Sequence, residues 1–466
     1  MNNCHPAPST QKVRRDALDG KRGDGWRRLD VLRRPDPNAI HLAPDDTSLT
    51  AVAGLVPFGQ FLRREGVDAQ LRRCFGAMKV GPMVRYGMPQ QIRMLIDATV
   101  TGAGRVFDLE ALAADPLFVR LAGGCVCSID TVYDDLRRFD DLTMPHLDAM
   151  VSEHGLAPLR ALRLAEVHVD IDTTVEPVFG EYMEGAVPGP NPRYHGRPNY
   201  HPILMTIAET RTVAGIQLRP GDTSLGEGDA VVVRRWLRRV REAVGPQCTI
   251  WVRIDSGGDC AELLKAIDDE PRCLFVVKAK IDPAVHGAIT RIERWKTVDR
   301  DADERPTRQA AEVPYERGSW AAAGLKARMV AVRERDQVNA RGKFLWEDLE
   351  WSAHAYVTNA AGVPADDIAH RYQGRAEIEP MIAELKGAWG IGQIPTQSFA
   401  ANEAMLRIKV LSYNLMRRYV AKHHGELAVW RTPWQRIVLI RIPGRLVYSG
   451  RQWCLHTPPH TRRMLN

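Results

Sequence analysis

The sequence predicts an α/β protein, in which helices cover a sheet and a helical module precedes it. Residues 45–160 carry apolar residues at helical spacing, whereas the segment from Val167 to Ile171 alternates apolar and polar residues as a strand does. Two further strand patterns follow, and then helix and strand patterns alternate. This order is typical of a sheet with helices packed on its faces.

The sequence predicts particular helices and strands for each part of the chain. The helical module, residues 45–160, is expected to contain helices over residues 59–75, 88–101 and 128–138, the last with Ser128 as N-cap. The first part of the core, residues 161–290, is expected to contain strands over 203–210, 212–218, 249–254 and 273–280, and helices over 227–244 and 259–267. The module's residues leave two roles open, a scaffold or dimer contact and the recognition of a DNA end sequence.

The core pattern is interrupted once. Residues 291–360 read as consecutive short strands and predict a β-rich insertion. The second part of the core, residues 361–425, is expected to hold a helix from residue 366 to 386 and a long amphipathic helix over 403–423. A basic tail, residues 426–466, is expected to form a hairpin over 437–455.

Composition and charge favour an anionic partner. The chain has 466 residues, of which 44% are hydrophobic and 26% charged, and its formal net charge is +7. A basic balance favours a polyanion such as nucleic acid. Residues 1–44 are basic and poor in apolar residues, so we expect them to form a disordered arm.

The cysteine spacing and the hydropathy pattern indicate the cellular compartment of the protein. None of the eight cysteines forms a Cys-x-x-Cys pair, which argues against a structural zinc site, and scattered thiols favour a reducing compartment. No apolar run reaches the roughly 18 residues that cross a bilayer, and the N-terminus lacks the apolar core of a secretory signal. We expect a cytoplasmic protein with no membrane partner.

Four residues of the predicted helix 366–386 share one stripe. They are Tyr372, Arg375, Glu379 and Lys386. Their offsets of three, seven and fourteen residues bring them within roughly 60° on a helix that turns about 100° per residue. A carboxylate among cations suits a metal ion beside a polyanion, although an Arg–Glu pair at this spacing also occurs on solvated faces. Pro380 should kink the helix.

Further carboxylates occur at strand positions. Asp170 and Asp172 lie two apart on the first strand, so both point to one face of the sheet. Aspartate is depleted in strands, and desolvated carboxylates need partners such as a divalent cation. Asp255 ends an apolar strand, where turn formation is the alternative role. Asp259 is the expected N-cap of the next helix, which would leave Asp255 available.

One acid from the first strand, Asp255 and Glu379 would together form a split triad. Such oxygen ligands suit Mg²⁺, with Mn²⁺ as a substitute. Two such ions activate the attacking oxygen and stabilise the leaving oxygen in phosphoryl transfer. The pattern alone leaves open whether Asp170 or Asp172 is the first acid.

With these motifs, the sequence resembles DDE transposases of bacterial insertion sequences, and in particular the group with a Tyr-x2-Arg-x3-Glu-x6-Lys signature. The stripe matches that spacing without a gap. Asp170-Ile-Asp-Thr-Thr resembles the group's first-acid motif and favours Asp172, while Arg253-Ile-Asp-Ser-Gly resembles the second-acid motif. Residues 191–202 resemble a basic loop of one branch of the group.

The resemblance implies a ribonuclease H-like catalytic core interrupted by the β-rich insertion, and a DNA transposase as the function. Asp172, Asp255 and Glu379 would bind Mg²⁺ and catalyse cleavage of transposon ends and strand transfer. The partners would be double-stranded DNA, both inverted-repeat ends and target, with a homodimer assembled on it. Residues that would contact DNA phosphates are Tyr372, Arg375, Lys386, Arg193 and Arg197.

Alternatives remain open both for the function of the protein and for the role of its tryptophans. A domesticated or decayed relative would bind DNA without cutting it, and a metal-dependent nuclease would cut without strand transfer. Within the insertion, Trp295, Trp320 and Trp346 are candidates for holding an unstacked base, with core packing as the alternative.

Overall fold

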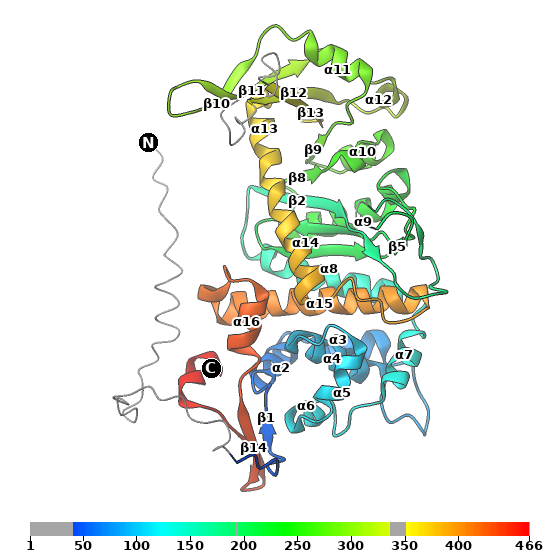
Figure 1. Cartoon of the computed structure of the whole chain (residues 1–466), viewed down its shortest axis with the longest axis vertical. Coiled ribbons are helices and arrows are strands. Elements are labelled where there is room, and N and C mark those ends of the chain that lie inside the picture. Colours follow the sequence, from blue (N-terminus) through cyan, green and yellow to red (C-terminus); the bar gives the residue numbers. More distant parts are fainter. Residues whose placement is uncertain (1–40, 192–193, 336–350, 466) are drawn as a thin grey trace.

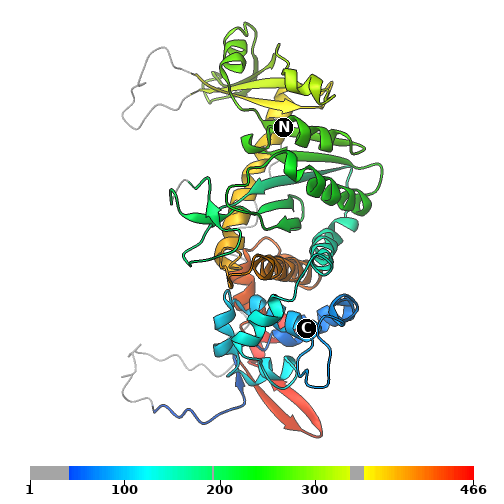
Figure 2. The ribbon, with the colours of Figure 1, turned by 90° about the vertical axis from the view of Figure 1, so that its right-hand side faces the viewer.

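The molecule is elongated, with its elements stacked in tiers along the long axis. The structure is a computed structural model that describes residues 41–191, 194–335 and 351–465. Figure 1 shows the helical module at one end, the central sheet in the middle and the strands β10–β13 at the other end. The long helix α15 (Phe399–His423) lies crosswise between module and sheet, and the view turned by 90° in Figure 2 shows the same tiers.

A nine-stranded mixed sheet forms the centre, in the order β10-β11-β12-β13-β9-β8-β2-β6-β7. Strand β2 pairs in parallel with β8 and antiparallel with β6. Strands β8 and β9 are parallel, whereas β6 and β7 are antiparallel. The bounds of these strands are β2 Glu166–Thr173, β6 Ile203–Ile207, β7 Thr212–Gln217, β8 Thr249–Ile254 and β9 Cys273–Lys278. The strands expected at these places are confirmed.

The strands of the insertion extend this sheet. Strand β13 pairs antiparallel with β9, and β12, β11 and β10 follow outward. Their bounds are β10 Lys296–Arg300, β11 Pro306–Val313, β12 Arg328–Arg335 and β13 Trp351–Thr358, with the short helix α12 (Gly318–Ala322) between β11 and β12. The expected short strands are therefore present, and the hydrogen-bonded ladder is continuous from them into the core.

Helices cover both faces of the sheet, and strand β8 carries apolar side chains toward both. In β8, Ile250 and Val252 pack against the helices on one face of the sheet, while Trp251 points to the opposite face. The first face is covered by α8 (Met144–Arg160), α9 (Ala230–Val244), α10 (Ala261–Asp268) and α11 (Pro283–Thr290). Helix α13 (Ala365–Gln373) covers the opposite face through Ile368 and Ala369.

The module is helical apart from the two-residue strand β1 (Leu49–Thr50). The single helix expected over residues 59–75 is wrong, because Gly66 adopts a φ of 74° and separates two helices. The helix expected over 88–101 is confirmed, and so is the N-cap role of Ser128, which accepts a bond from Thr131 N. The helices are α2 (Leu55–Arg64), α3 (Val67–Phe75), α4 (Met88–Thr101), α5 (Leu109–Leu112), α6 (Pro116–Leu121) and α7 (Ile129–Leu136).

The C-terminal part folds back onto the module. Helix α16 (Thr432–Leu439) precedes a hairpin of β14 (Gly444–Ser449) and β15 (Gln452–His456), and β14 pairs with β1. The hairpin expected from residue 437 is wrong at its start, because residues 437–439 are helical. The chain ends with α17 (Arg462–Leu465). Within the described ranges, no helix is long and apolar enough to cross a membrane.

Candidate functional site

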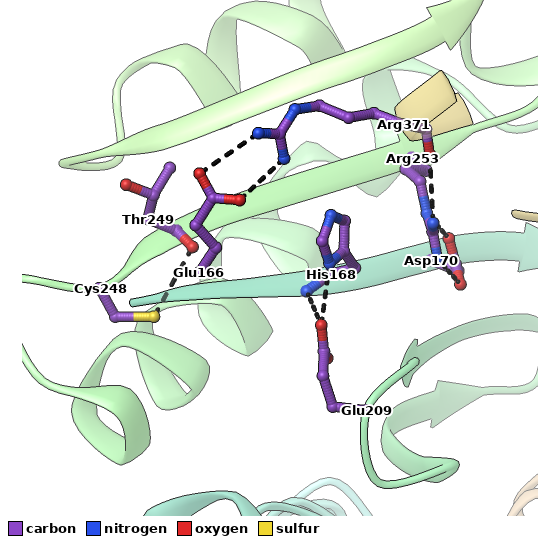
Figure 3. Close-up of polar contacts among 8 residues, drawn as sticks. All are labelled: Glu166, His168, Asp170, Glu209, Cys248, Thr249, Arg253 and Arg371. Atoms are coloured by element: carbon purple, nitrogen blue, oxygen red, sulfur yellow. Dashed lines mark hydrogen bonds and ion pairs between the residues drawn. The ribbon is translucent and has the colours of Figure 1, made fainter. Parts of the chain in front are cut away.

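The polar face of β2 carries a row of ion pairs. Every second residue of β2 points to this face and is titratable, and Figure 3 shows three of these residues with their partners. Arg371 of α13 pairs bidentately with Glu166, and His168 Nδ1 lies 2.8 Å from Glu209 Oε1. The row continues with Asp170 and ends at Asp172, one residue before the end of the strand.

Asp170 is engaged in a buried ion pair. It lies opposite Arg253 in the parallel register of β2 and β8. The Arg253 guanidinium donates to both carboxylate oxygens, over 2.6 and 2.8 Å. Burial raises the pKa of Asp170, and Arg253 opposes that rise. A carboxylate with both oxygens held inside the protein holds the sheet together, which leaves Asp172 as the candidate acid of this strand.

The same arginine anchors the turn after α13. Arg253 Nη1 donates to the carbonyl of Arg371 over 3.2 Å. A Cβ atom on Gly374 would lie only 2.2 Å from Arg253 Nη1, so a larger residue at this position would displace the guanidinium. Arg253 and Gly374 were missed as site-supporting residues, because no pattern in the sequence gives the register that places them together.

The predicted helix 366–386 is interrupted. Helix α13 ends at Gln373, a 3₁₀ turn spans Gly374–Glu377, and α14 spans Ile378–Ala388. Pro380 explains the position of the break, because its ring opposes the carbonyl four residues earlier, at Ala376. The expectation of one regular helix is therefore wrong, although the two helices run on in nearly the same direction in Figure 1.

Asp172 lies in the field of two other acids. Burial raises the pKa of Asp172 to about 6, with Asp255 and Glu379 adding to the rise, while Arg375 and the backbone N–H of Thr173 oppose it. Arg375 Nη2 lies 2.9 Å from Asp172 Oδ2. Asp255, at a strand end, and Glu379, on a helix, thus both lie within electrostatic reach of Asp172.

Asp255 also has a local role. Its side chain caps the 3₁₀ turn Ser256–Gly258 by accepting a bond from Gly257 N over 2.9 Å. The expected N-cap role of Asp259 is wrong, because Cys260 is the N-cap residue of α10, and Asp259 instead pairs with Arg317. The turn role uses only one oxygen of Asp255, which leaves the other for a ligand.

The third acid, Glu379, differs in exposure from its neighbours Arg375 and Tyr372. Glu379 is exposed and makes no hydrogen bond or ion pair with any described residue. Arg375 is buried; burial opposes its charge, but Asp172 and Tyr372 outweigh that effect and raise its pKa. Tyr372 packs on Tyr356 with ring centroids 4.5 Å apart. Burial raises the pKa of Tyr372 to about 12, and Asp255 and Asp172 add to the rise.

Lys386 binds the segment that follows β2. Its Nζ donates to Thr174 Oγ1 and the carbonyl of Val175, over 3.0 and 2.7 Å, and lies 3.1 Å from Glu176 Oε1. These contacts fix α14 against the chain leaving β2. Tyr372, Arg375 and Lys386 thus face the sheet side, whereas Glu379 is open to solvent.

Arg197 of the basic loop and two of the three candidate tryptophans lie among the described residues. The Arg197 guanidinium lies 4.5 Å from the ring centroid of Phe179. This loop belongs to a small sheet of β3 (Glu176–Pro177), β5 (Pro198–Tyr200) and β4 (Val187–Pro188). Trp320 is buried in the core, and Trp295 is covered by the Arg333 guanidinium at 4.4 Å. Arg193 and Trp346 lie outside the described residues.

The donor chemistry of the acid site fits a hard cation. Asp255 and Glu379 disfavour the charge on Asp172, and a divalent ion relieves such repulsion. In the described part of the chain, no group of three or more Asp, Glu, His or Cys side chains is gathered closely enough to hold a metal. Asp172 faces Arg375 instead, so the Mg²⁺ site stays a prediction, and its formation requires Asp172 to exchange partners.

Comparisons with known proteins show the family of the chain and a distant likeness to solved structures. No curated protein matches the sequence. A solved structure titled "Cryo-EM structure of piggyBac transposase synaptic complex with hairpin DNA" is 12% identical, with 83% of this chain and 79% of that chain covered at a TM-score of 0.42. The family assignment therefore rests on the sequence match, which runs over residues 35–462 to the family described as "Transposase DDE domain group 1". Since that match spans most of its length, the chain belongs to the DDE transposase domain group 1 family.

Proposed function

We propose that the protein is a DNA transposase that cleaves transposon ends and joins them to target DNA by metal-assisted phosphoryl transfer. The observation that carries the proposal is that Asp255 and Glu379, from two other elements, both act electrostatically on the buried Asp172 at the end of β2. Family membership supports the same reaction class. Mg²⁺ bound by these acids would activate the attacking oxygen and stabilise the leaving one.

Arg375 has the features of a phosphate ligand beside these acids. Its guanidinium is buried, its Nη2 binds Asp172, and its Nε has no hydrogen-bond partner among the described residues. A buried donor without a partner is costly, so an incoming phosphate oxygen would be stabilised there. Tyr372, packed beside it, would limit the positions that the arginine can take.

The surrounding architecture supports the proposal of a ribonuclease H-like core. Strands β7, β6 and β2 are antiparallel neighbours, and β8 and β9 continue in parallel with β2. The candidate acids Asp172 and Asp255 lie at the ends of adjacent parallel strands, where side chains converge. The net charge of +7 favours DNA as the partner, and we also propose that a homodimer assembles on the DNA ends.

A nicking assay on end DNA tests the proposal with a matched pair of variants. Glu379→Gln should abolish cleavage in Mg²⁺ or Mn²⁺, because an amide cannot replace the carboxylate charge that holds the cation. Glu377→Gln, two residues away and also exposed, should cut like the parent. Binding of both variants should remain within a few-fold of the parent. Cleavage by Glu379→Gln would refute the acid assignment, and a parent that binds but never cuts would favour the non-catalytic relative.

A further inference from the structure

One face of α13 joins the insertion to the acid site. Three residues of this helix, spaced three apart, contact strands of the insertion, and they are Asp366, Ala369 and Tyr372. Arg375 follows at the same spacing, in the 3₁₀ turn after α13, and contacts Asp172 instead. Figure 1 shows α13 beginning beside the insertion strands and running toward α14. Because residues three apart are neighbours on a helix, the four residues form one continuous stripe.

Two of the insertion contacts fix the helix as a whole. Lys296 of β10 pairs with Asp366 at 2.7 Å, and Arg308 of β11 donates to the carbonyl of Ala369 over 3.5 Å. These positions on α13 lie nine and six residues before Arg375. With a helix rise of about 1.5 Å per residue, both contacts are too far along the helix to act on that side chain directly.

The third contact is a pair of packed rings at the junction of insertion and core. Tyr356 is the first residue of β13 that pairs with the core strand β9, where it lies opposite Lys278. Its side chain is buried, and its ring centroid lies 4.5 Å from that of Tyr372, with 39° between the ring planes. The ring of His354 packs edge-on against it, with 5.4 Å between centroids. A buried ring on a strand that is paired on both sides offers Tyr372 a fixed surface.

Tyr372 in turn lies beside Arg375. Each side chain acts on the ionisation of the other, since Tyr372 raises the pKa of Arg375 and Arg375 opposes the rise in the pKa of Tyr372. On the core side, Arg253 fixes the end of α13 by donating to the carbonyl of Arg371 over 3.2 Å. The turn that carries Arg375 is therefore held from the core by one contact and from the insertion by the packed rings.

We propose that Tyr356 is a positioning residue of the acid site and that it holds Arg375 in place through the ring of Tyr372. This inference rests on the proposed function, in which Arg375 is the ligand of a DNA phosphate. Removal of the Tyr356 ring leaves a space into which Tyr372 can relax. Arg375 then leaves Asp172 more readily, and it is less well placed for a phosphate oxygen.

A double-mutant cycle on the full chain tests the inference with two ligands. The parent, Tyr356→Ala, Arg375→Ala and the double variant are titrated calorimetrically with Mn²⁺ in the absence of DNA, and by fluorescence anisotropy in EDTA with a labelled transposon-end duplex. Tyr356→Ala should shift both affinities about threefold in the direction of Arg375→Ala, toward tighter Mn²⁺ and weaker DNA binding. In the Arg375→Ala background the same substitution should change neither affinity, because the side chain through which it acts is absent.

Further variants separate positioning from a general loss of packing. Tyr356→Phe keeps the ring and should restore the parent's affinity for both ligands. Tyr419→Ala removes a similarly buried aromatic, which packs on Phe58 where α15 meets the module, and should leave both affinities unchanged. Thermal melts establish that each variant is folded. If Tyr356→Ala does not fold, Tyr356→Leu, which fills the space without an aromatic face, replaces it in the cycle.

Several outcomes overturn the proposal. They are additive effects of the two substitutions, parent affinities or an opposite shift in Tyr356→Ala, and failure of Tyr356→Phe to restore the parent's values. An Arg375→Ala variant that binds both ligands like the parent also overturns it, because Tyr356 then has nothing through which to act.

A nicking assay on the same duplex distinguishes this inference from the proposed function. If the effects are non-additive but the parent never cuts, the positioning role stands and the transposase function fails. If the parent cuts but the effects are additive, the transposase function stands and the positioning role fails.

Discussion

Arg375 Nη2 lies 2.9 Å from Asp172 Oδ2, which places a cation where a metal ligand is expected. The pair joins β2 to the 3₁₀ turn between α13 and α14. In the absence of metal, the guanidinium offsets part of the repulsion that Asp255 and Glu379 exert on Asp172. Arg375 and a divalent ion therefore compete for one carboxylate.

This competition predicts how substitution of Arg375 changes the affinity for metal in the absence of DNA. Arg375→Ala should bind Mn²⁺ several-fold more tightly than the parent, because no cation then needs to leave Asp172. Arg371→Ala removes the neighbouring arginine, whose partner is Glu166, and should bind Mn²⁺ like the parent. Calorimetric titration of Mn²⁺ into DNA-free protein measures the difference. Weaker binding to Arg375→Ala would mean that the arginine supports the metal site instead of competing for it.

Gly374 gives a prediction about stability. Alanine normally stabilises a helical glycine position by about 0.5–1 kcal/mol, and Gly374 has a helical backbone with φ −59°. Here Gly374→Ala should instead destabilise by about 2–4 kcal/mol, because the new Cβ displaces Arg253 and leaves buried Asp170 without its partner. Gly387→Ala on α14 meets open space and should be neutral or stabilising. Urea unfolding measures both, and equal effects would show that Arg253 can move without cost.

Much of the fold could be predicted from the sequence because local patterns dominate it. The apolar run of β8 and the alternation in β2 decide those strands without tertiary information. Errors arose where one residue overrides a periodic pattern. Gly66 divides a continuous amphipathic stretch, and residues 437–439 join α16 although their composition suits a strand as well.

The site was only partly predictable, for a different reason. The identities of Asp172, Asp255 and Glu379 as metal-binding acids follow from spacing and resemblance, and they stay a prediction. The roles of Asp170 and Lys386 depend on neighbours that no spacing reveals, namely Arg253 across the sheet and the segment containing Thr174. Register and side-chain partners are properties of the folded chain.

Binding of duplex DNA should depend strongly on salt. Each phosphate that the protein neutralises contributes about −0.9 to the slope of log affinity against log salt. Arg197→Ala should therefore weaken binding and make the slope shallower by about one. Arg238→Ala serves as control, because this exposed arginine lies on α9, on the opposite sheet face from α13, and pairs with Glu270. Anisotropy titrations at several salt concentrations decide the matter, and a flat response would count against a DNA partner.

Lys409 gives the protein a pH-dependent stability. Its ammonium is fully buried, and burial lowers its pKa to about 7, with Glu176 and Asp108 opposing. The unfolded chain keeps this proton up to the usual lysine pKa of 10.5, so between these limits the unfolded state binds more protons. The free energy of unfolding should therefore rise with pH above 7, by up to about 1.4 kcal/mol per pH unit from this group.

Lys409→Met isolates that contribution, because all other titrating groups are shared with the parent. The variant should lose stability overall, since the carbonyls of Gly390 and Gln393 lose their donor. Its deficit relative to the parent should grow between pH 7.5 and 9.5, within the window where the folded parent has already released the proton, and should be constant below pH 6.5. Urea unfolding at four pH values measures the deficit. Parallel stability curves across the whole range would mean that the folded protein keeps Lys409 charged, with Glu176 as its counterion.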